Sequence, residues 1–132
     1  MAKYKAVAAT SMKVFENWGT SEFTDKALSV LAETSEGKPV FRDFNNGVRI
    51  GVVVSATIKD GRLIIVVNMD DSCAIHKNDR IVPGFIVSED CWEEIDGKIV
   101  HRKIECVESV NYGLTKHPVE RELPEIELLK EG

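Results

Sequence analysis

Hydrophobic and polar residues alternate along much of this chain with a period of two, which is the pattern of β-strands. The clearest run covers residues 48–58, where apolar side chains stand at every second position, and residues 63–69 form a second apolar run. Asp60-Gly61 lies between the two runs and suits a tight turn, because both residues tolerate positive φ. The pattern therefore predicts an antiparallel hairpin in the middle of the chain.

Shorter alternating runs predict further strands on both sides of this hairpin. Asp96-Gly97 is a second turn of the same kind, with a strand expected on each side of it. Pro83-Gly84 is expected to interrupt the strand predicted at residues 81–87. Residues 11–20 carry turn chemistry, and the chain after Tyr112-Gly113 is expected to be loop-like. The additional strands are predicted at residues 4–9, 40–42, 81–87, 93–95 and 98–108.

One segment, residues 24–36, has the spacing of an amphipathic helix. Leu28 and Leu31 stand three positions apart on one expected face, and Thr24 is suited to cap the N-terminus. Gly37 follows the last apolar position and ends the helix. A short helical turn is also expected near residues 74–77. Strands with one main helix predict an α+β fold, specifically a small, mostly antiparallel β-barrel or half-barrel.

The composition is typical of a globular protein, and we assign residues 1–132 to a single domain. The sequence has 17 basic and 22 acidic residues, a formal net charge of −5. Binding to nucleic acid is not expected, because no basic surplus exists to displace counterions from phosphates. Attraction to anionic lipid is not expected either, and the longest strongly apolar run, residues 63–67, is too short to cross a bilayer. We therefore expect no membrane partner.

Cysteine usage and the N-terminal residues bear on the compartment. The first ten residues have too short an apolar stretch for a signal peptide, so synthesis in a cytoplasm is expected. Three cysteines at irregular spacing indicate reduced thiols. Whether Cys73, Cys91 or Cys106 form disulfides between subunits stays open at this point.

Four segments between Phe23 and Pro118 form a recognisable series of motifs. They are Phe23-Thr24-Asp25-Lys26-Ala27-Leu28 with Gly37-Lys38-Pro39-Val40, Ile50-Gly51-Val52-Val53 with Asp60-Gly61-Arg62-Leu63, Ile81-Val82-Pro83-Gly84-Phe85-Ile86-Val87, and the segment 104–118 through Glu108-Ser109-Val110. In this order they resemble the prohead (capsid maturation) protease family of tailed bacteriophages, whose fold is that of herpesvirus assemblin. The resemblance implies a protease-like fold, a phage virion as the setting and virion proteins as partners.

The positions that the resemblance gives to catalysis carry unreactive side chains. The family's histidine falls on Phe44 and its nucleophilic serine falls on Val82. Phenylalanine cannot accept a proton and valine cannot attack a carbonyl, so the nucleophile–base pair is absent. We therefore expect a catalytically dead pseudoprotease and no residual peptidase activity.

Other residues offer weaker candidates for chemistry. A serine protease site rebuilt from His76 or His101 with Ser55, Ser88 or Ser109 lacks any accompanying elbow or oxyanion motif. Cys73 and His76 have the spacing of two metal ligands, but no second Cys/His pair completes a zinc site. No phosphate-binding glycine loop is present. We expect neither a metal nor a cofactor.

Large apolar residues outside the expected core are candidates for contacts between subunits. Trp18 lies in a turn segment, whereas Trp92 is expected to pack at the core or at an edge. Two terminal segments are also candidates, an N-terminal arm over 1–20 and an acidic C-terminal tail over 119–132. In that tail the candidate interface residues are Leu123, Ile126 and Leu128.

The expected function is that of a structural virion protein of a tailed phage, made in the cytoplasm of a bacterial host. It would decorate or cement the capsid, or act as a minor head component, as a homo-oligomer in contact with the major capsid protein. Two alternatives stay open. One is an active minimal prohead serine protease with a relocated nucleophile, and the other is an internal scaffold or assembly chaperone.

Overall fold

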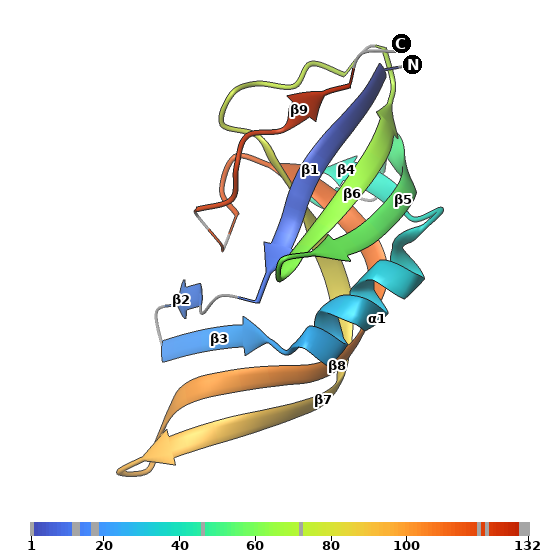
Figure 1. Ribbon diagram of the computed structural model, residues 1–132. Coiled ribbons are helices and arrows are strands. Elements are labelled where there is room, and N and C mark those ends of the chain that lie inside the picture. Colours follow the sequence, from blue (N-terminus) through green and yellow to red (C-terminus); the bar gives the residue numbers. More distant parts are fainter. Residues whose placement is uncertain are drawn as a thin grey trace.

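The computed structural model describes residues 2–11, 14–16, 19–45, 47–71, 73–118, 120 and 122–129. Most of these residues belong to strands or to a single helix (Figure 1). The fold is α+β and mostly β, in agreement with the sequence. No helix among these residues has the length and apolar character that a membrane span requires. The elements are β1 (Ala2–Thr10), β2 (Val14–Glu16), β3 (Gly19–Phe23), α1 (Asp25–Ser35), β4 (Pro39–Arg42), β5 (Arg49–Lys59), β6 (Arg62–Met69), β7 (Arg80–Ile95), β8 (Lys98–Thr115) and β9 (Glu127–Leu128).

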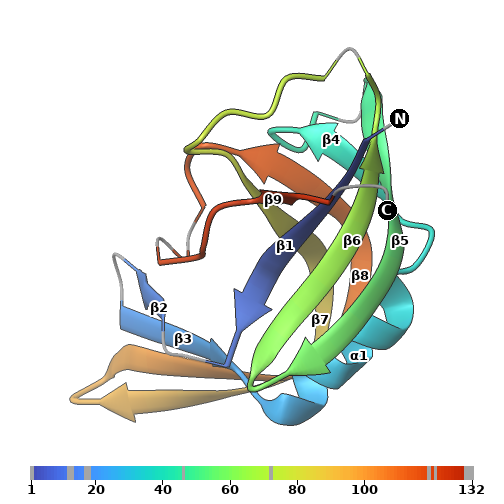
Figure 2. The same ribbon diagram turned by 45° about the horizontal axis from the view of Figure 1, so that its top comes forward.

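The strands form one mixed sheet in the order β2-β3-β8-β4-β5-β6-β1-β9, with β7 on β8. Strand β7 pairs with β8 along its whole length, so β3 and β4 share the other edge of β8, and both run parallel to it. Helix α1 connects β3 to β4 and packs across the gap between them, as Figure 2 shows from a second angle.

The sheet curls but stays open, so the expectation of a closed barrel is wrong. Closure would require hydrogen bonds between β1 and β7, which face each other without pairing. Pro83 lies on this free side of β7, and proline suits an edge strand because it has no N–H to donate. The parallel pairs of β8 also depart from the mostly antiparallel arrangement that the sequence predicts.

The helix and the two hairpins match their predictions. The Thr24 hydroxyl accepts the N–H of Ala27 at 3.1 Å and caps α1. Leu28 and Leu31 are fully buried on the inner face of α1. Both hairpin turns have positive φ at their two central residues, 52° and 70° at Asp60-Gly61 and 53° and 77° at Asp96-Gly97. Local signals therefore determine these three features.

The core lies inside the curl of the sheet and beneath α1. Strand β6 shows the expected alternation most clearly, because every second residue from Leu63 to Met69 is buried. On β5 the buried positions are Gly51 and Val53, and a bulge between Val53 and Ser55 shifts the alternation beyond them. The other buried apolar residues come from β1, α1, β4, β7, β8 and the C-terminal segment, and they include Ala8, Leu28, Leu31, Val40, Ile81, Val107, Tyr112, Leu114 and Leu123.

Three local predictions are wrong, and long-range pairing explains each. Strand β7 continues through Pro83-Gly84, because Tyr112 and Asn111 of β8 pair with these residues. The segment expected to be irregular contains β2 and β3, which pair with each other and with β8. Strand β8 continues beyond Tyr112 to Thr115 because β4 and β7 flank it there.

The helical turn expected near 74–77 is absent. Residues 73–76 have no regular secondary structure, and a turn follows at 77–78. Its backbone groups bind side chains instead of one another, since Arg42 donates to the Ala74 carbonyl at 3.0 Å and the His76 N–H donates to Asp79 at 2.8 Å. Side-chain partners of this kind compete with helical hydrogen bonds.

Candidate functional site

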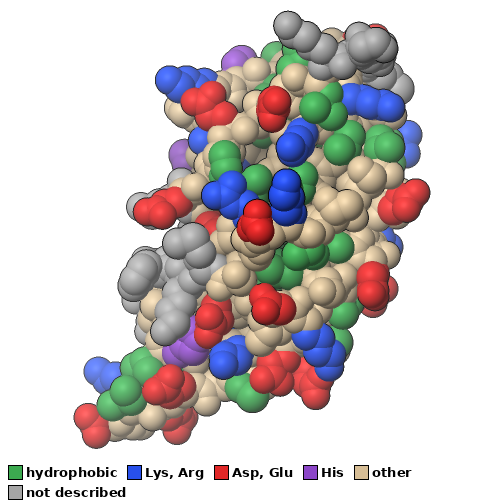
Figure 3. Space-filling view, in the orientation of Figure 1, with side chains coloured by type: hydrophobic (Ala, Val, Ile, Leu, Met, Phe, Trp, Pro, Cys, Tyr) green, Lys and Arg blue, Asp and Glu red, His purple; other side chains and the backbone are tan. Residues whose placement is uncertain are grey.

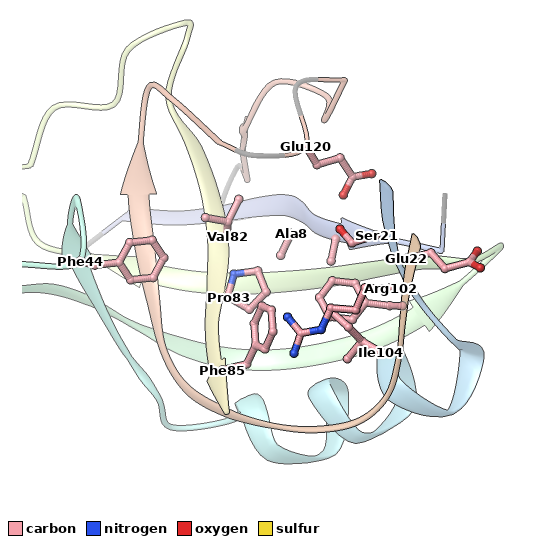
Figure 4. Close-up of a pocket in the computed structure, with 12 residues that line it drawn as sticks. Ala8, Ser21, Glu22, Phe44, Val82, Pro83, Phe85, Arg102, Ile104 and Glu120 are labelled. Carbon is pink, nitrogen blue, oxygen red and sulfur yellow. The ribbon is translucent and has the colours of Figure 1, made fainter. Parts of the chain in front are cut away.

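A cavity of about 240 Å³ lies between β7 and the end of β1, beyond the residues of β1 that pair with β9. Figure 4 shows its lining side chains, which come from β1, β3, β7, β8, the loop after β4 and the C-terminal segment. Most of the lining is apolar, and the rings of Phe23 and Phe85 meet edge to face at 5.2 Å. The lining residues are Ala8, Ala9, Ser21, Glu22, Phe23, Phe44, Val82, Pro83, Phe85, Arg102, Ile104 and Glu120.

Phe44 and Val82 both line this cavity although 38 positions separate them in the sequence (Figure 4). Phe44 has a φ of 58°, which is unusual for a bulky side chain, and its ring packs against Gly84 and Gly113. A Cβ atom on either glycine would crowd the ring. The two glycines therefore make room for Phe44, and the side chains of Phe44 and Val82 offer the cavity only hydrocarbon.

The charged side chains at the cavity are engaged with neighbours. Arg102 donates from Nε to Asp90 at 2.8 Å, and its guanidinium lies 4.8 Å from the ring centroid of Trp92. Glu22 lies at the margin and points away from the cavity (Figure 4). No nucleophile–base pair therefore lines the cavity among the residues that the structure describes.

Glu120 lies at the cavity wall and binds the end of β1. The Thr10 hydroxyl donates to its Oε1. Burial raises the pKa of Glu120 above its usual value, and the hydrogen bonds from Thr10 lower it in part. The folded protein therefore holds this carboxyl in a place that favours its neutral form.

Replacement of Glu120 by glutamine is expected to stabilise the protein at pH 7 by less than about 1 kcal/mol, since water screens a half-buried group. A carboxyl whose pKa is higher in the folded state contributes stability below its unfolded pKa and loses it as the pH rises through its folded pKa. The advantage of glutamine should therefore be present at pH 7 and shrink at about pH 4, near the unfolded value. Urea unfolding at both pH values measures it. The exposed Glu125→Gln variant is the control, and an unchanged advantage at pH 4 would contradict the prediction.

His101 forms a separate polar cluster on the opposite face of β3 and β8. Its Nδ1 lies 2.6 Å from the Thr20 hydroxyl and its Nε2 lies 3.0 Å from Oε1 of Glu22. Thr20 and Glu22 alternate with Ser21, which lines the cavity, so the cluster faces away from it. Sequence reasoning selected His101 but missed both partners, because a parallel pairing of β3 with β8 brings them together.

The serines considered as partners of histidine lie elsewhere. Ser109 is buried and bonds to Ser35 and to the Leu31 carbonyl, at the contact between α1 and β8. Ser88 donates to the Cys106 carbonyl at 3.3 Å. Ser55 is exposed on β5. None of the three bonds to His76 or His101 in the described part of the chain.

The loop between β6 and β7 is organised by an ion pair that the sequence analysis did not find. The Asp79 side chain is fully buried, and its Oδ1 lies 3.2 Å from Nη1 of Arg42. Cys73 lies beside Arg42, at 4.0 Å, and burial raises the pKa of its thiol. Cys73 and His76 therefore belong to a structural loop, and no group of three or more potential ligands forms a metal site among the residues described.

The candidate interface residues have different surroundings. Trp18 lies outside the described residues. Leu123 is 3% exposed and Ile126 packs against the core, whereas Leu128 is 57% exposed on β9. Strand β9 pairs with β1, so the C-terminal segment folds onto its own chain. Of the segment 1–20, residues 2–10 are a strand between β6 and β9.

Trp92 and the three cysteines are the remaining candidate residues. Trp92 is 48% exposed on the edge strand β7, so of the two places that the sequence suggests, core or edge, it occupies the edge. The three cysteines are free thiols. Cys91 is exposed beside Glu105, whose negative charge raises the pKa of the thiol.

Comparison of the chain with protein-family models, with curated proteins and with solved structures finds no match.

Proposed function

We propose that this chain is a structural virion protein of a tailed phage, built on a fold like that of the prohead proteases and without their catalytic residues. One observation carries the proposal. Phe44 and Val82 stand at the positions that the resemblance gives to the catalytic histidine and serine, and both line the same cavity. A base and a nucleophile must lie close together to react. Convergence of these two positions supports a former active site that is now apolar.

The path of the sheet fits this proposal. From β1 through β6, β5, β4 and β8 to β7, the strands curl until β1 and β7 flank the cavity. We describe this arrangement as a half-barrel that is open on the cavity side. The resemblance implies a protease-like fold of this kind.

Binding, in this proposal, takes the place of catalysis. A capsid decoration or cement protein, or a minor head component, acts through shape and edge complementarity with the major capsid protein. Each contact can be weak, because many copies on a symmetric shell act together. Homo-oligomers suit such a lattice. The chain's net charge of −5 favours protein surfaces over packaged DNA as partners.

Quantitative mass spectrometry of purified, DNA-filled particles tests the proposal. The chain is expected in many copies per particle, at a fixed ratio to the major capsid protein. Its presence only in precursor shells would contradict this role and favour a scaffold or assembly chaperone. A fluorophosphonate probe is expected to leave the chain unlabelled. Labelling that disappears when a single serine is replaced would instead indicate an active serine protease.

A second candidate, a minimal protease with a relocated nucleophile, has one observation in its favour. Thr20, His101 and Glu22 form a hydroxyl–imidazole–carboxylate chain with distances of 2.6 and 3.0 Å. The geometry resembles that of a catalytic triad, but the cluster faces away from the cavity. Incubation with casein, followed by mass spectrometry of new termini, tests it. Cleavage that is lost in Thr20→Val, with the fold intact, would favour this candidate over the first.

A further inference from the structure

The far end of the β7–β8 hairpin projects from the molecule as an arm (Figure 1). We call residues 91–99 the arm tip. All nine of these residues are exposed, on both faces of the ribbon. Strand β3 supports β8 only from His101 to Ile104, so no other element among the described residues pairs with the two-stranded ribbon of the arm tip. A ribbon of this kind is at best marginally stable in water by itself.

The arm tip carries three large apolar side chains in water. Trp92 is 48% exposed, Ile95 is 55% exposed and Ile99 is 41% exposed. Trp92 pairs with Arg102 and Glu94 pairs with Ile99 across the hairpin, so Trp92 and Ile99 share one face, and Ile95 lies on the other. Exposed apolar groups gathered in one place and rimmed by polar residues are typical of interaction sites. In Figure 3, hydrophobic and acidic side chains gather at this end of the molecule.

Uncompensated negative charge surrounds these apolar groups. Nearer the body, Glu89 lies 3.9 Å from Lys26 and Asp90 lies 2.8 Å from Arg102. In the tip itself, by contrast, the carboxylates of Glu93, Glu94 and Asp96 form no ion pair with any residue that the structure describes. Lys98 is the single basic residue of the segment. The arm tip therefore attracts positive charge.

The outer edge of β7 is open to another strand. Among the described strands β7 pairs only with β8, so the backbone groups on its other edge are available for pairing. A second copy of the chain is a poor occupant, because edge-to-edge pairing of two arm tips would bring the carboxylates of both copies together against only one lysine from each. Like charges opposite one another destabilise a strand pair. The occupant that fits is a strand of opposite charge.

We propose that the arm tip binds an extended, basic segment of another protein, which adds as a strand to the open edge of β7. Main-chain hydrogen bonds supply affinity in such a complex, and side chains on alternate positions supply specificity. Glu93 and Glu94 point to opposite faces of the ribbon. An alternating partner strand can therefore place its basic side chains against Glu94 and its apolar side chains over Ile95, or its basic side chains against Glu93 and its apolar side chains over Trp92. This inference goes beyond the proposed function and does not depend on the state of the cavity.

A blocked octapeptide of alternating lysine and valine is the probe, with an alternating glutamate and valine peptide as its counterpart. The lysine peptide is expected to bind, and its affinity should fall as salt is added. The glutamate peptide should bind at least about tenfold more weakly than the lysine peptide. Hydrogen exchange of the full chain locates the peptide. Amides of β7 between Ile86 and Ile95 should gain protection.

The double variant Glu93→Lys/Glu94→Lys is expected to bind the lysine peptide at least about tenfold more weakly than the original chain, which corresponds to about 1.4 kcal/mol of binding free energy. Both positions are exposed, so the thermal melt should not change. The control is Glu33→Lys/Glu36→Lys, which makes the same change of charge at exposed positions of α1 and the residue after it. The affinity of the control variant for the lysine peptide should stay within about twofold of that of the original chain. A difference of this size is what the change in net charge alone would cause.

Three outcomes would overturn the proposal. The first is equal affinity of the two double variants for the lysine peptide, since binding would then follow net charge alone. The second is protection outside β7, or no binding at about 1 mM peptide. The third is a dimer in sedimentation that the Glu93→Lys/Glu94→Lys exchange alters, because the edge would then serve a second copy.

Discussion

Replacement of Asp79 by alanine is expected to lower the free energy of unfolding by about 1–3 kcal/mol, the cost of leaving hydrogen-bond donors in the protein without their acceptor. The Asp79 side chain is fully buried, with Oδ1 at 3.2 Å from Arg42 and Oδ2 accepting the His76 N–H at 2.8 Å. Alanine leaves the guanidinium without its carboxylate and the backbone N–H without an acceptor. Arg42 keeps the Ala74 carbonyl as a partner and is 38% exposed to water, so its charge is only partly uncompensated in the variant. Urea unfolding measures the loss.

Two further variants separate the parts of this effect. Asp79→Asn keeps the shape and one acceptor oxygen, so its loss should be smaller than that of alanine. Asp70→Ala is the matched control in the same loop, because this side chain is exposed, and its effect should stay within about 0.5 kcal/mol. A loss in Asp79→Ala no larger than in Asp70→Ala would show that the ion pair does not organise the loop.

Replacement of Tyr112 by alanine is expected to cost at least about 3–5 kcal/mol, the range for removing a large aromatic from a core. Tyr112 is the largest of the fully buried side chains. Its hydroxyl lies 2.5 Å from that of Ser35, which also bonds to Ser109 at 3.1 Å and to the Leu31 carbonyl. This cluster joins the C-terminal turn of α1 to β8. Alanine would remove both the packing of the aromatic ring and the hydrogen bond of the Tyr112 hydroxyl to Ser35.

Tyr112→Phe isolates the contribution of the hydroxyl and is expected to cost about 1–3 kcal/mol, because Ser35 loses a buried partner. Burial raises the pKa of Tyr112, so its hydroxyl stays protonated near neutral pH and remains able to donate. Tyr4→Phe is the control, at the chain's other tyrosine, and should change stability by no more than about 0.5 kcal/mol. Urea midpoints of the three variants provide the measurement. A Tyr112→Phe protein as stable as Tyr4→Phe would contradict a role for the hydroxyl cluster.

Sequence reasoning succeeds in this chain where the signal is local. The two Asp-Gly turns require positive φ at adjacent residues, and few dipeptides supply it. Thr24 caps a helix whose apolar positions recur at helical spacing. The alternation from Leu63 to Met69 needs only one buried face. Each of these features depends on residues a few positions apart, so the printed sequence contains the whole signal.

The same reasoning fails where a distant strand decides. Pro83-Gly84 interrupts a strand in isolation, but its pairing with Asn111 and Tyr112 keeps it in β7. Gly19 and Thr20 read as a turn until β8 provides a parallel partner. Parallel pairs join strands that a long connection separates in the sequence, and no local pattern announces them.

The candidate site shows the same division. The resemblance selected Phe44 and Val82 as positions of lost chemistry, and the structure brings both into one cavity. It offered no sign of the Arg42–Asp79 pair or of the open edge at the arm tip. Leu123 was selected for an exposed tail, yet it is buried because Arg80 binds its carbonyl at 2.8 Å and holds the segment against the body.

The sequence by itself determined the elements of this protein: one capped helix, two tight hairpins, and strands whose alternation marks an inner face. Only the tertiary structure decided which strand edges meet and which stay open. Side-chain periodicity specifies the faces of a strand, whereas hydrogen bonding at its edges depends on chain segments far away in the sequence. The cavity between β1 and β7 and the open edge of the arm tip are both products of that second choice.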